Sequence, residues 1–192
     1  MIRTLFSLPD RALSWLEPMS TPILTTLARF IFAAVLLVYF WNSGLTKVGD
    51  DFSGLFAPSF NAFAQIFPKG AEAASYDITQ ATQFQKLVIL AGTWAEFVLP
   101  ALVVLGLFTR AAAFGMVGFV VVQSLTDVFA HGGETGAWFD NLSDGVILDQ
   151  RAFWVFLLLY LVFKGGGPLS LDRFVLRSEQ SLYQDDLQLS RG

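Results

Sequence analysis

Residues 87–108 read LVILAGTWAEFVLPALVVLGLF, and this run decides the fold. A helix needs about 20 apolar residues to cross the hydrocarbon core of a bilayer, and this run meets that length. It nevertheless carries a carboxylate, Glu96, near its middle. An ionisable group at that depth costs several kcal/mol unless it is paired, protonated or hydrated. The sequence therefore predicts an integral membrane protein in which the surrounding helices supply Glu96 with a partner.

The composition of the whole chain supports a membrane protein. Of the 192 residues, 54% are hydrophobic and only 15% are charged, which is more apolar than a soluble domain of this size. The net charge is −4 and the basic residues are scattered, so nucleic acid is not an expected partner. The chain has no cysteine, which excludes disulfides, thiol catalysis and cysteine-ligated clusters.

Apolar runs predict an all-α bundle of four crossings. The expected limits are 23–41, about 79–108, 111–129 and about 146–163. An aromatic group at 39–41 is typical of a membrane boundary. Only Thr109-Arg110 separates the second run from the third, so those two helices are expected to be antiparallel neighbours.

Two short helices are expected outside the crossings. The first lies at the membrane interface within the N-terminal segment 1–22, either as a surface helix or as an ordinary lead-in to the first crossing. The second covers residues 58–67, with Phe60, Phe63 and Phe67 at helical spacing and a stop at Pro68-Lys69-Gly70. It is expected either to pack against the bundle or to cover its mouth.

The distribution of Lys and Arg predicts the orientation. The N-terminal segment, the turn at 109–110 and the C-terminal tail are richer in these residues than the two long loops, so both termini are expected in the cytoplasm. The chain divides into an N-terminal segment 1–22, a four-helix membrane domain 23–172 and a polar cytoplasmic tail 173–192.

Six polar residues are expected in the outer half of the bundle or at its rim. They are Lys47, Glu96, Gln123, Asp127, Asp149 and Arg151. One interpretation is a ligand pocket with Glu96 as its deepest member and Lys47 or Arg151 as the countercharge. The alternative is a structural network that fixes the helix register, since interhelical polar contacts contribute about 0.6 to 2 kcal/mol each.

The remaining candidates are weaker. Asp127, His131 and Glu134 would share one helix face and could ligate a divalent metal, but Gly132-Gly133 favours an end to the helix before that, so no metal is firmly predicted. Arg29 and Arg110 are expected near the cytoplasmic leaflet. They either anchor to headgroups or contact a partner subunit or an anionic ligand. Arg29, about two turns into the first crossing, could instead pair inside the bundle.

Three motifs follow one another along the chain. They are Arg29 followed by Gly44 and Lys47, Glu96 followed by Leu105-Gly106-Leu107-Phe108-Thr109-Arg110, and the ending Gly167-Pro168-Leu169-Ser170-Leu171-Asp172. Together they resemble the DoxX family of small bacterial membrane proteins, over roughly residues 25–172. The resemblance implies a four-helix bundle in a bacterial inner membrane, and relatives include a subunit of a thiosulfate:quinone oxidoreductase and membrane partners of redox or detoxification enzymes.

Three functions remain open from the sequence. The first is an accessory subunit that holds a quinone or a sulfur species for a redox partner, without catalysis by this chain alone. The second is a small proton or solute carrier that uses Glu96. The third is a structural membrane scaffold. A homo-oligomer is compatible with each of them.

Overall fold

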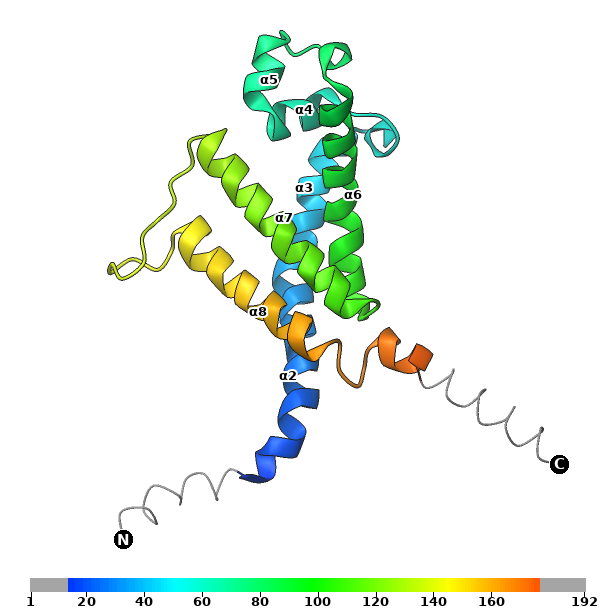
Figure 1. The fold of residues 1–192 in the computed structure, drawn as a ribbon, viewed down its shortest axis with the longest axis vertical. Coiled ribbons are helices and arrows are strands. Elements are labelled where there is room, and N and C mark those ends of the chain that lie inside the picture. The colour runs from blue at the N-terminus through cyan, green and yellow to red at the C-terminus, as the bar shows by residue number, and fades with distance from the viewer. Residues whose placement is uncertain (1–13, 177–192) are drawn as a thin grey trace, which may run out of the picture.

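The computed structural model describes residues 14–176, and all regular structure in that range is helical (Figure 1). Four helical segments are long and apolar enough to cross a bilayer: Ser14–Val48, Gln83–Leu105, Thr109–Phe129 and Val146–Lys164. The predicted all-α bundle of four crossings is therefore confirmed. The interfacial helix expected in segment 1–22 lies mostly outside the described residues, as does most of the tail.

The first crossing is longer than the sequence pattern predicts. It consists of a 3-10 turn Ser14–Leu16, α2 (Glu17–Phe32), a π-helical segment Ala33–Leu37 and α3 (Val38–Val48). The aromatic group at 39–41 is not its end, because the helix continues to Val48 and stops at Gly49, whose φ of 74° suits glycine. The extra turns bring Ser43 and Lys47 onto the bundle.

The first long connection folds into a small helical cap, which we define as residues 53–80. It contains α4 (Phe60–Ile66) and α5 (Pro68–Ala73) between the 3-10 turns Ser53–Leu55 and Ile78–Gln80. The predicted helix at 58–67 is present as α4. It ends at Ile66, before the predicted stop at Pro68. The sequence pattern did not predict α5, in which Pro68 occupies the first position, where its missing N–H has no helical partner to lose.

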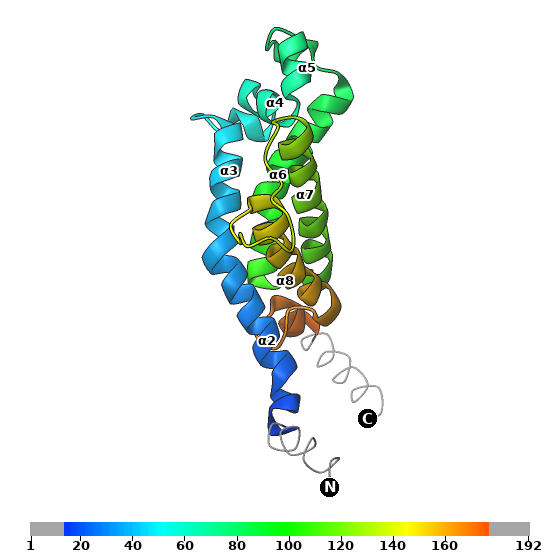
Figure 2. The ribbon, with the colours of Figure 1, turned by 90° about the vertical axis from the view of Figure 1, so that its left-hand side faces the viewer.

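The cap has its own apolar core and sits on the end of α6. Phe63, Ala62 and Ala71 are buried there against Ile89 of α6. Several hydrogen bonds hold the cap on the bundle. Among them, Ser59 Oγ donates to the Lys47 carbonyl at 2.5 Å, and the Trp94 indole donates to the Leu55 carbonyl at 2.9 Å. In Figures 1 and 2 the cap lies at the end of the molecule opposite to Ser14.

An exposed carboxylate organises the last turn of the cap. Asp77 Oδ1 accepts hydrogen bonds from the Thr79 hydroxyl at 2.7 Å and the Thr79 amide at 2.9 Å. These bonds favour the charged form and hold the pKa of Asp77 below its usual value. Asp77 thereby orients the chain as it leaves the cap for α6.

The second crossing, α6 (Gln83–Leu105), begins later than the predicted Thr79. Thr82 caps it in a reciprocal capping box with Gln85. The third crossing is α7 (Thr109–Phe129), and the turn between them is 106–108 rather than Thr109-Arg110, which form the first turn of α7. The two helices are antiparallel neighbours, as expected (Figure 1).

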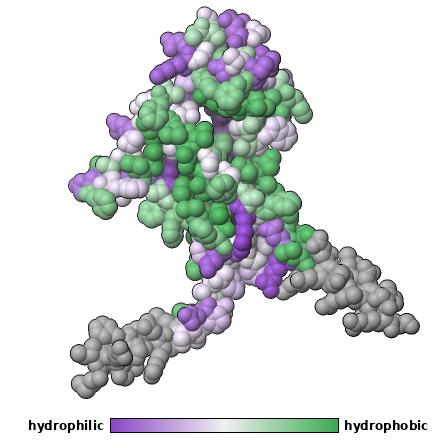
Figure 3. Space-filling model, viewed as in Figure 1, coloured by the Kyte–Doolittle hydropathy of each residue, from purple (hydrophilic) through white to green (hydrophobic). Residues whose placement is uncertain are grey.

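The fourth crossing begins at Val146, as predicted. A π-helical segment Val146–Gln150 leads into α8 (Arg151–Lys164), which packs beside α7 and α2 (Figure 2). The main core lies among the four crossings and is built on Phe32, Phe40, Met116 and Leu158. The outer surface of the bundle is apolar over much of the same height (Figure 3). Large apolar side chains such as Phe114 and Phe153 are exposed there, as expected of residues that face lipid.

Candidate functional site

A buried ion pair joins the first crossing to the second. Lys47 Nζ lies 2.9 Å from Glu96 Oε2 and 3.0 Å from Oε1, and the two side chains are only 7% and 3% exposed. The carboxylate in the middle of the 87–108 run thus has the partner that its depth demands. Lys47 comes from the last turn of α3, which exists because that helix extends to Val48.

Ser43 completes the polar contacts of this pair. Its hydroxyl lies 2.8 Å from Glu96 Oε1, to which it donates, and 3.1 Å from Lys47 Nζ, while Nζ also donates to the Ser43 carbonyl at 3.0 Å. Ser43 and Lys47 are four residues apart, so they lie on one face of α3. That spacing is a signal in the sequence that could have added Ser43 to the predicted candidates.

Gly44 lets the two helices approach closely enough for the pair to form. A Cβ atom at this position would lie 2.7 Å from the ring of Phe97, which is closer than side chains pack. The ring of Phe97 therefore fills the space beside Gly44. The neighbouring Trp41 indole donates to the Phe97 carbonyl at 3.2 Å and adds a second tie between α3 and α6.

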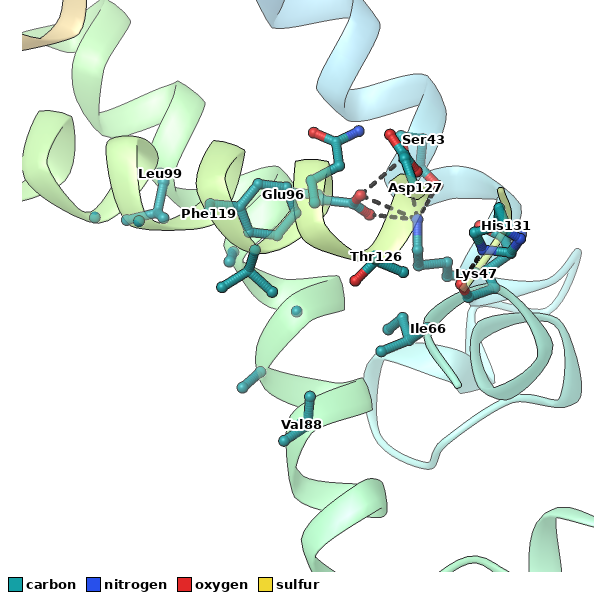
Figure 4. A pocket seen from close by; sticks show the side chains of 18 residues that line it. Ser43, Lys47, Ile66, Val88, Glu96, Leu99, Phe119, Thr126, Asp127 and His131 are labelled. Atoms are coloured by element: carbon teal, nitrogen blue, oxygen red, sulfur yellow. Dashed lines mark hydrogen bonds and ion pairs between the residues drawn. The ribbon is translucent and has the colours of Figure 1, made fainter. Parts of the chain in front are cut away.

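A cleft of about 460 Å³ adjoins the ion pair (Figure 4). Its walls come mainly from α6 and α7, with Ser43 and Lys47 of α3, and its end is covered by Gln65 and Ile66 of the cap. Lys47, Glu96, Gln123, Asp127 and His131 give it one polar region. Most of the remaining wall is apolar, including Leu99 and Phe119. The volume falls within the usual range for small-molecule sites, about 300 to 1,000 Å³.

Four of the six predicted pocket residues line this cleft: Lys47, Glu96, Gln123 and Asp127. The other two do not. Asp149 accepts a hydrogen bond from the Gly145 amide at 2.9 Å and so shapes the start of the fourth crossing. Arg151 is buried on α8 and forms no ion pair with Glu96. Of the two predicted countercharges, only Lys47 pairs with Glu96.

Arg151 binds the last two turns of α7 instead. Its Nη2 lies 2.6 Å from Asp127 Oδ2, and its Nη1 donates to Ser124 Oγ at 3.0 Å. The guanidinium also lies over the ring of Trp154, 5.9 Å from the centroid. Asp127 therefore faces the cleft while Arg151 of α8 compensates its charge. The same ion pair joins α8 to α7.

Gln123 has one buried atom without a partner among the described residues. Its amide nitrogen donates to the Tyr39 hydroxyl at 3.1 Å, whereas Oε1 is buried and accepts nothing. Buried polar atoms are hydrogen-bonded in most proteins. Gln123 lines the cleft, so a rotation of its side chain would bring this acceptor from its buried position to a ligand.

The weak metal candidates do not come together. α7 ends at Phe129, so Glu134 does not share a helix face with Asp127. Asp127 is paired with Arg151, and His131 Nε2 lies 2.8 Å from the Gln65 carbonyl of the cap. Within residues 14–176 no group of three or more metal-ligating side chains is arranged to hold an ion.

Arg29 forms a second polar centre at the other end of the molecule. Its guanidinium donates to four backbone carbonyls: Val103 at 3.1 Å, Val104 at 2.5 Å, Gly166 at 3.1 Å and Leu169 at 3.0 Å. The side chain is buried, so of the alternatives for Arg29 the structure favours a contact inside the bundle over anchoring to headgroups. It binds carbonyls of the last turn of α6, where the helix itself leaves carbonyls without a full set of partners; Val103 also accepts from the Gly106 amide at 3.2 Å. Arg110 is exposed and takes no part.

Asp172 joins the same centre from the segment after α8. Its carboxylate accepts from the Phe108 amide at 2.6 Å, the Thr109 amide at 2.9 Å and the Thr109 hydroxyl at 2.7 Å, which caps the start of α7. We call Arg29, the turn 106–109 and the segment 166–172 the basal clasp. Sequence reasoning missed Asp172 as a functional contact, although it stands at the end of the recognised Gly-rich motif.

The three motifs of the resemblance thus converge on two places, the ion pair and the basal clasp. The family model for DoxX matches residues 24–132. The chain belongs to the DoxX family. The matched range contains Arg29, Lys47, Glu96 and the turn 106–108, so the ion pair and part of the basal clasp lie within it, while α8 lies beyond it. No curated protein and no solved structure matches the chain significantly.

Proposed function

We propose that this DoxX-family membrane protein binds a quinone in the cleft beside Lys47 and Glu96 and holds it for a partner redox enzyme. The observation that carries the proposal is the cleft itself, a volume of about 460 Å³ bounded by a buried ion pair and by apolar helix faces. A site that is mostly apolar with a few convergent polar groups suits an amphipathic small molecule.

The charges around the cleft favour a neutral ligand. Lys47 is neutralised by Glu96, and Asp127 by Arg151, so the four side chains sum to zero. An anionic sulfur species would meet two carboxylates without a free cation. A quinone is neutral and, when reduced, has a hydroxyl that can donate to Oε1 of Gln123. Lys47 has no free N–H for a quinone carbonyl, because its three donors are shared between Ser43 and Glu96. Its ring would pack against Phe119 and Leu99.

The redox chemistry would belong to a partner. A chain without cysteine offers no thiol for sulfur transfer and no thiolate for an iron–sulfur cluster. The role proposed for this chain is to bind the quinone, to orient it by the polar end of the cleft and to exclude water from it.

Binding of a short-chain ubiquinone analogue to the protein in lipid nanodiscs tests the proposal. We expect saturable binding that falls at least tenfold in Gln123→Leu and in Lys47→Met/Glu96→Leu, which removes both charges together. Arg110→Gln, an exposed residue at the far end, is the control and should bind as the wild type does. Absence of saturable binding, or equal affinity in all four proteins, would overturn the proposal. Solute uptake into liposomes that depends on Glu96 would favour a carrier instead.

A further inference from the structure

The cleft is open on the side that faces the bilayer. Its rim is formed by Ala91 of α6 and by Gly118 and Val122 of α7, all of which are exposed. Every wall residue on these two helices lies inside a segment long and apolar enough to span a membrane. The opening therefore lies at the depth of the lipid chains rather than at the aqueous surface.

The two ends of the cleft are closed. At one end the cap places Gln65 and Ile66 over it, and His131 contacts the Gln65 carbonyl from the end of α7 (Figure 4). At the other end α6 and α7 are in contact, because a Cβ atom at Gly115 would lie 3.2 Å from Leu99. A ligand that reaches the ion pair by the open side would come from between the helices.

Gly118 leaves a groove in that open side. A Cβ atom built at this residue meets nothing within 4 Å, whereas Gly115, one turn earlier, is already in contact. Across the groove, a Cβ atom at Gly92 would meet only Ile66, at 3.6 Å. Glycine weakens a helix relative to alanine by about 1 kcal/mol. At Gly118, therefore, packing against a neighbouring helix does not account for the missing side chain.

We infer that the cleft takes a membrane-resident ligand with an apolar tail, which enters sideways from the bilayer between α6 and α7 and lays its tail along Gly118. This inference rests on the proposed function and adds the route and the tail to it. The polar head lies near Lys47 and the free Oε1 of Gln123, both within the same cleft. A small water-soluble solute would need neither the groove nor an opening at the depth of the lipid chains.

A binding experiment separates the tail from the head. Two probes are compared in nanodiscs, a benzoquinone with a decyl tail and the same ring without the tail. We expect Gly118→Phe to weaken binding of the tailed probe at least tenfold and to change the tail-less probe by less than twofold. Val121→Phe, a lipid-facing residue on the same helix outside the cleft, should change neither. Gly118→Phe should fold, because nothing lies in its way and glycine is the poorer helix former.

The outcomes are distinguishable. Equal binding of both probes to the wild type, or no effect of Gly118→Phe on the tailed probe, overturns the groove and leaves the proposed function standing. If neither probe binds, the proposed quinone site fails, and a spin label decides the sideways opening. Since the chain has no cysteine, a label on Gly118→Cys is unique. It should collide with lipid-dissolved oxygen far more than with a water-soluble nickel complex, and the reverse ratio would refute the opening.

Discussion

The contribution of Glu96 to the stability of the protein depends on Lys47, and that of Lys47 depends on Glu96. Breaking a buried ion pair by removing one partner costs about 3 to 5 kcal/mol, because a charge is left buried and unpaired, whereas replacing both by apolar groups is often close to neutral. We therefore expect Glu96→Leu and Lys47→Met each to lower the stability by several kcal/mol, and the double variant to recover most of that loss.

Thermal unfolding in detergent measures this double-mutant cycle. Ser43→Ala serves as the graded control: it removes the hydroxyl that contacts both charges and leaves the pair itself intact, so it should cost about 1 kcal/mol. Additive losses in the double variant would contradict the prediction, since additivity means that the two residues do not act as a pair.

The sequence predicts that Glu96 needs a partner but not which residue supplies it. Lys47 and Arg151 were equally open, because the choice depends on the rotation of α3 and α8 about their axes. Arg29 is a harder case. Its carbonyl partners lie 74 to 140 residues away along the chain, and backbone carbonyls leave no mark on a sequence. Only the buried arginine itself signalled a contact.

At the scale of elements, α7 begins where Asp172 caps it. The carboxylate satisfies two backbone N–H groups and the Thr109 hydroxyl and places a negative charge at the positive end of the helix dipole. Replacing an N-cap residue costs about 0.5 to 2 kcal/mol. We expect Asp172→Ala to lie in the upper part of this range, because the same contact also ties the segment after α8 to the turn 106–108.

Hydrogen exchange locates that effect. The amides of Phe108 and Thr109 should exchange faster in Asp172→Ala, while those of the cap stay unchanged. Arg110→Gln changes an exposed residue on the same first turn and should leave exchange as it is. Uniformly faster exchange over the whole bundle would show that Asp172 stabilises the global fold and does not cap α7 specifically.

The sequence predicts which segments of the chain form membrane-spanning helices, but it does not predict where all of those helices end. Apolar runs of about 20 residues identify the four crossings, because the bilayer fixes their length. The predictions were incomplete or wrong where local chemistry has two meanings. Pro68 follows the end of α4, as predicted, but it also starts α5, which was not predicted. Aromatic residues at 39–41 can mark a membrane boundary or pack in a core, and Phe40 lies in the core against Phe119 and Trp154.

At the scale of the whole molecule, the structure has two different ends. The cap and the polar region of the cleft lie toward one end, and the basal clasp and both ends of the described chain lie toward the other (Figures 1 and 2). Among the described residues, Arg110, Lys164 and Arg173 lie toward the basal end. In the sequence, the N-terminal segment and the C-terminal tail add Arg3, Arg11, Arg177 and Arg191 to this count. The positive-inside rule then predicts a cytoplasmic basal end and a cap on the outside.

Two single-cysteine variants test this orientation, and the absence of native cysteine makes each label unique. Ala73→Cys lies on the exposed face of α5 in the cap, and Arg110→Cys on the exposed first turn of α7. In intact cells a membrane-impermeant maleimide should label Ala73→Cys and leave Arg110→Cys unlabelled. After permeabilisation both should react, which shows that each thiol is accessible. The reverse pattern would place the polar end of the cleft toward the cytoplasm, and a partner enzyme would then have to be sought on that side of the membrane.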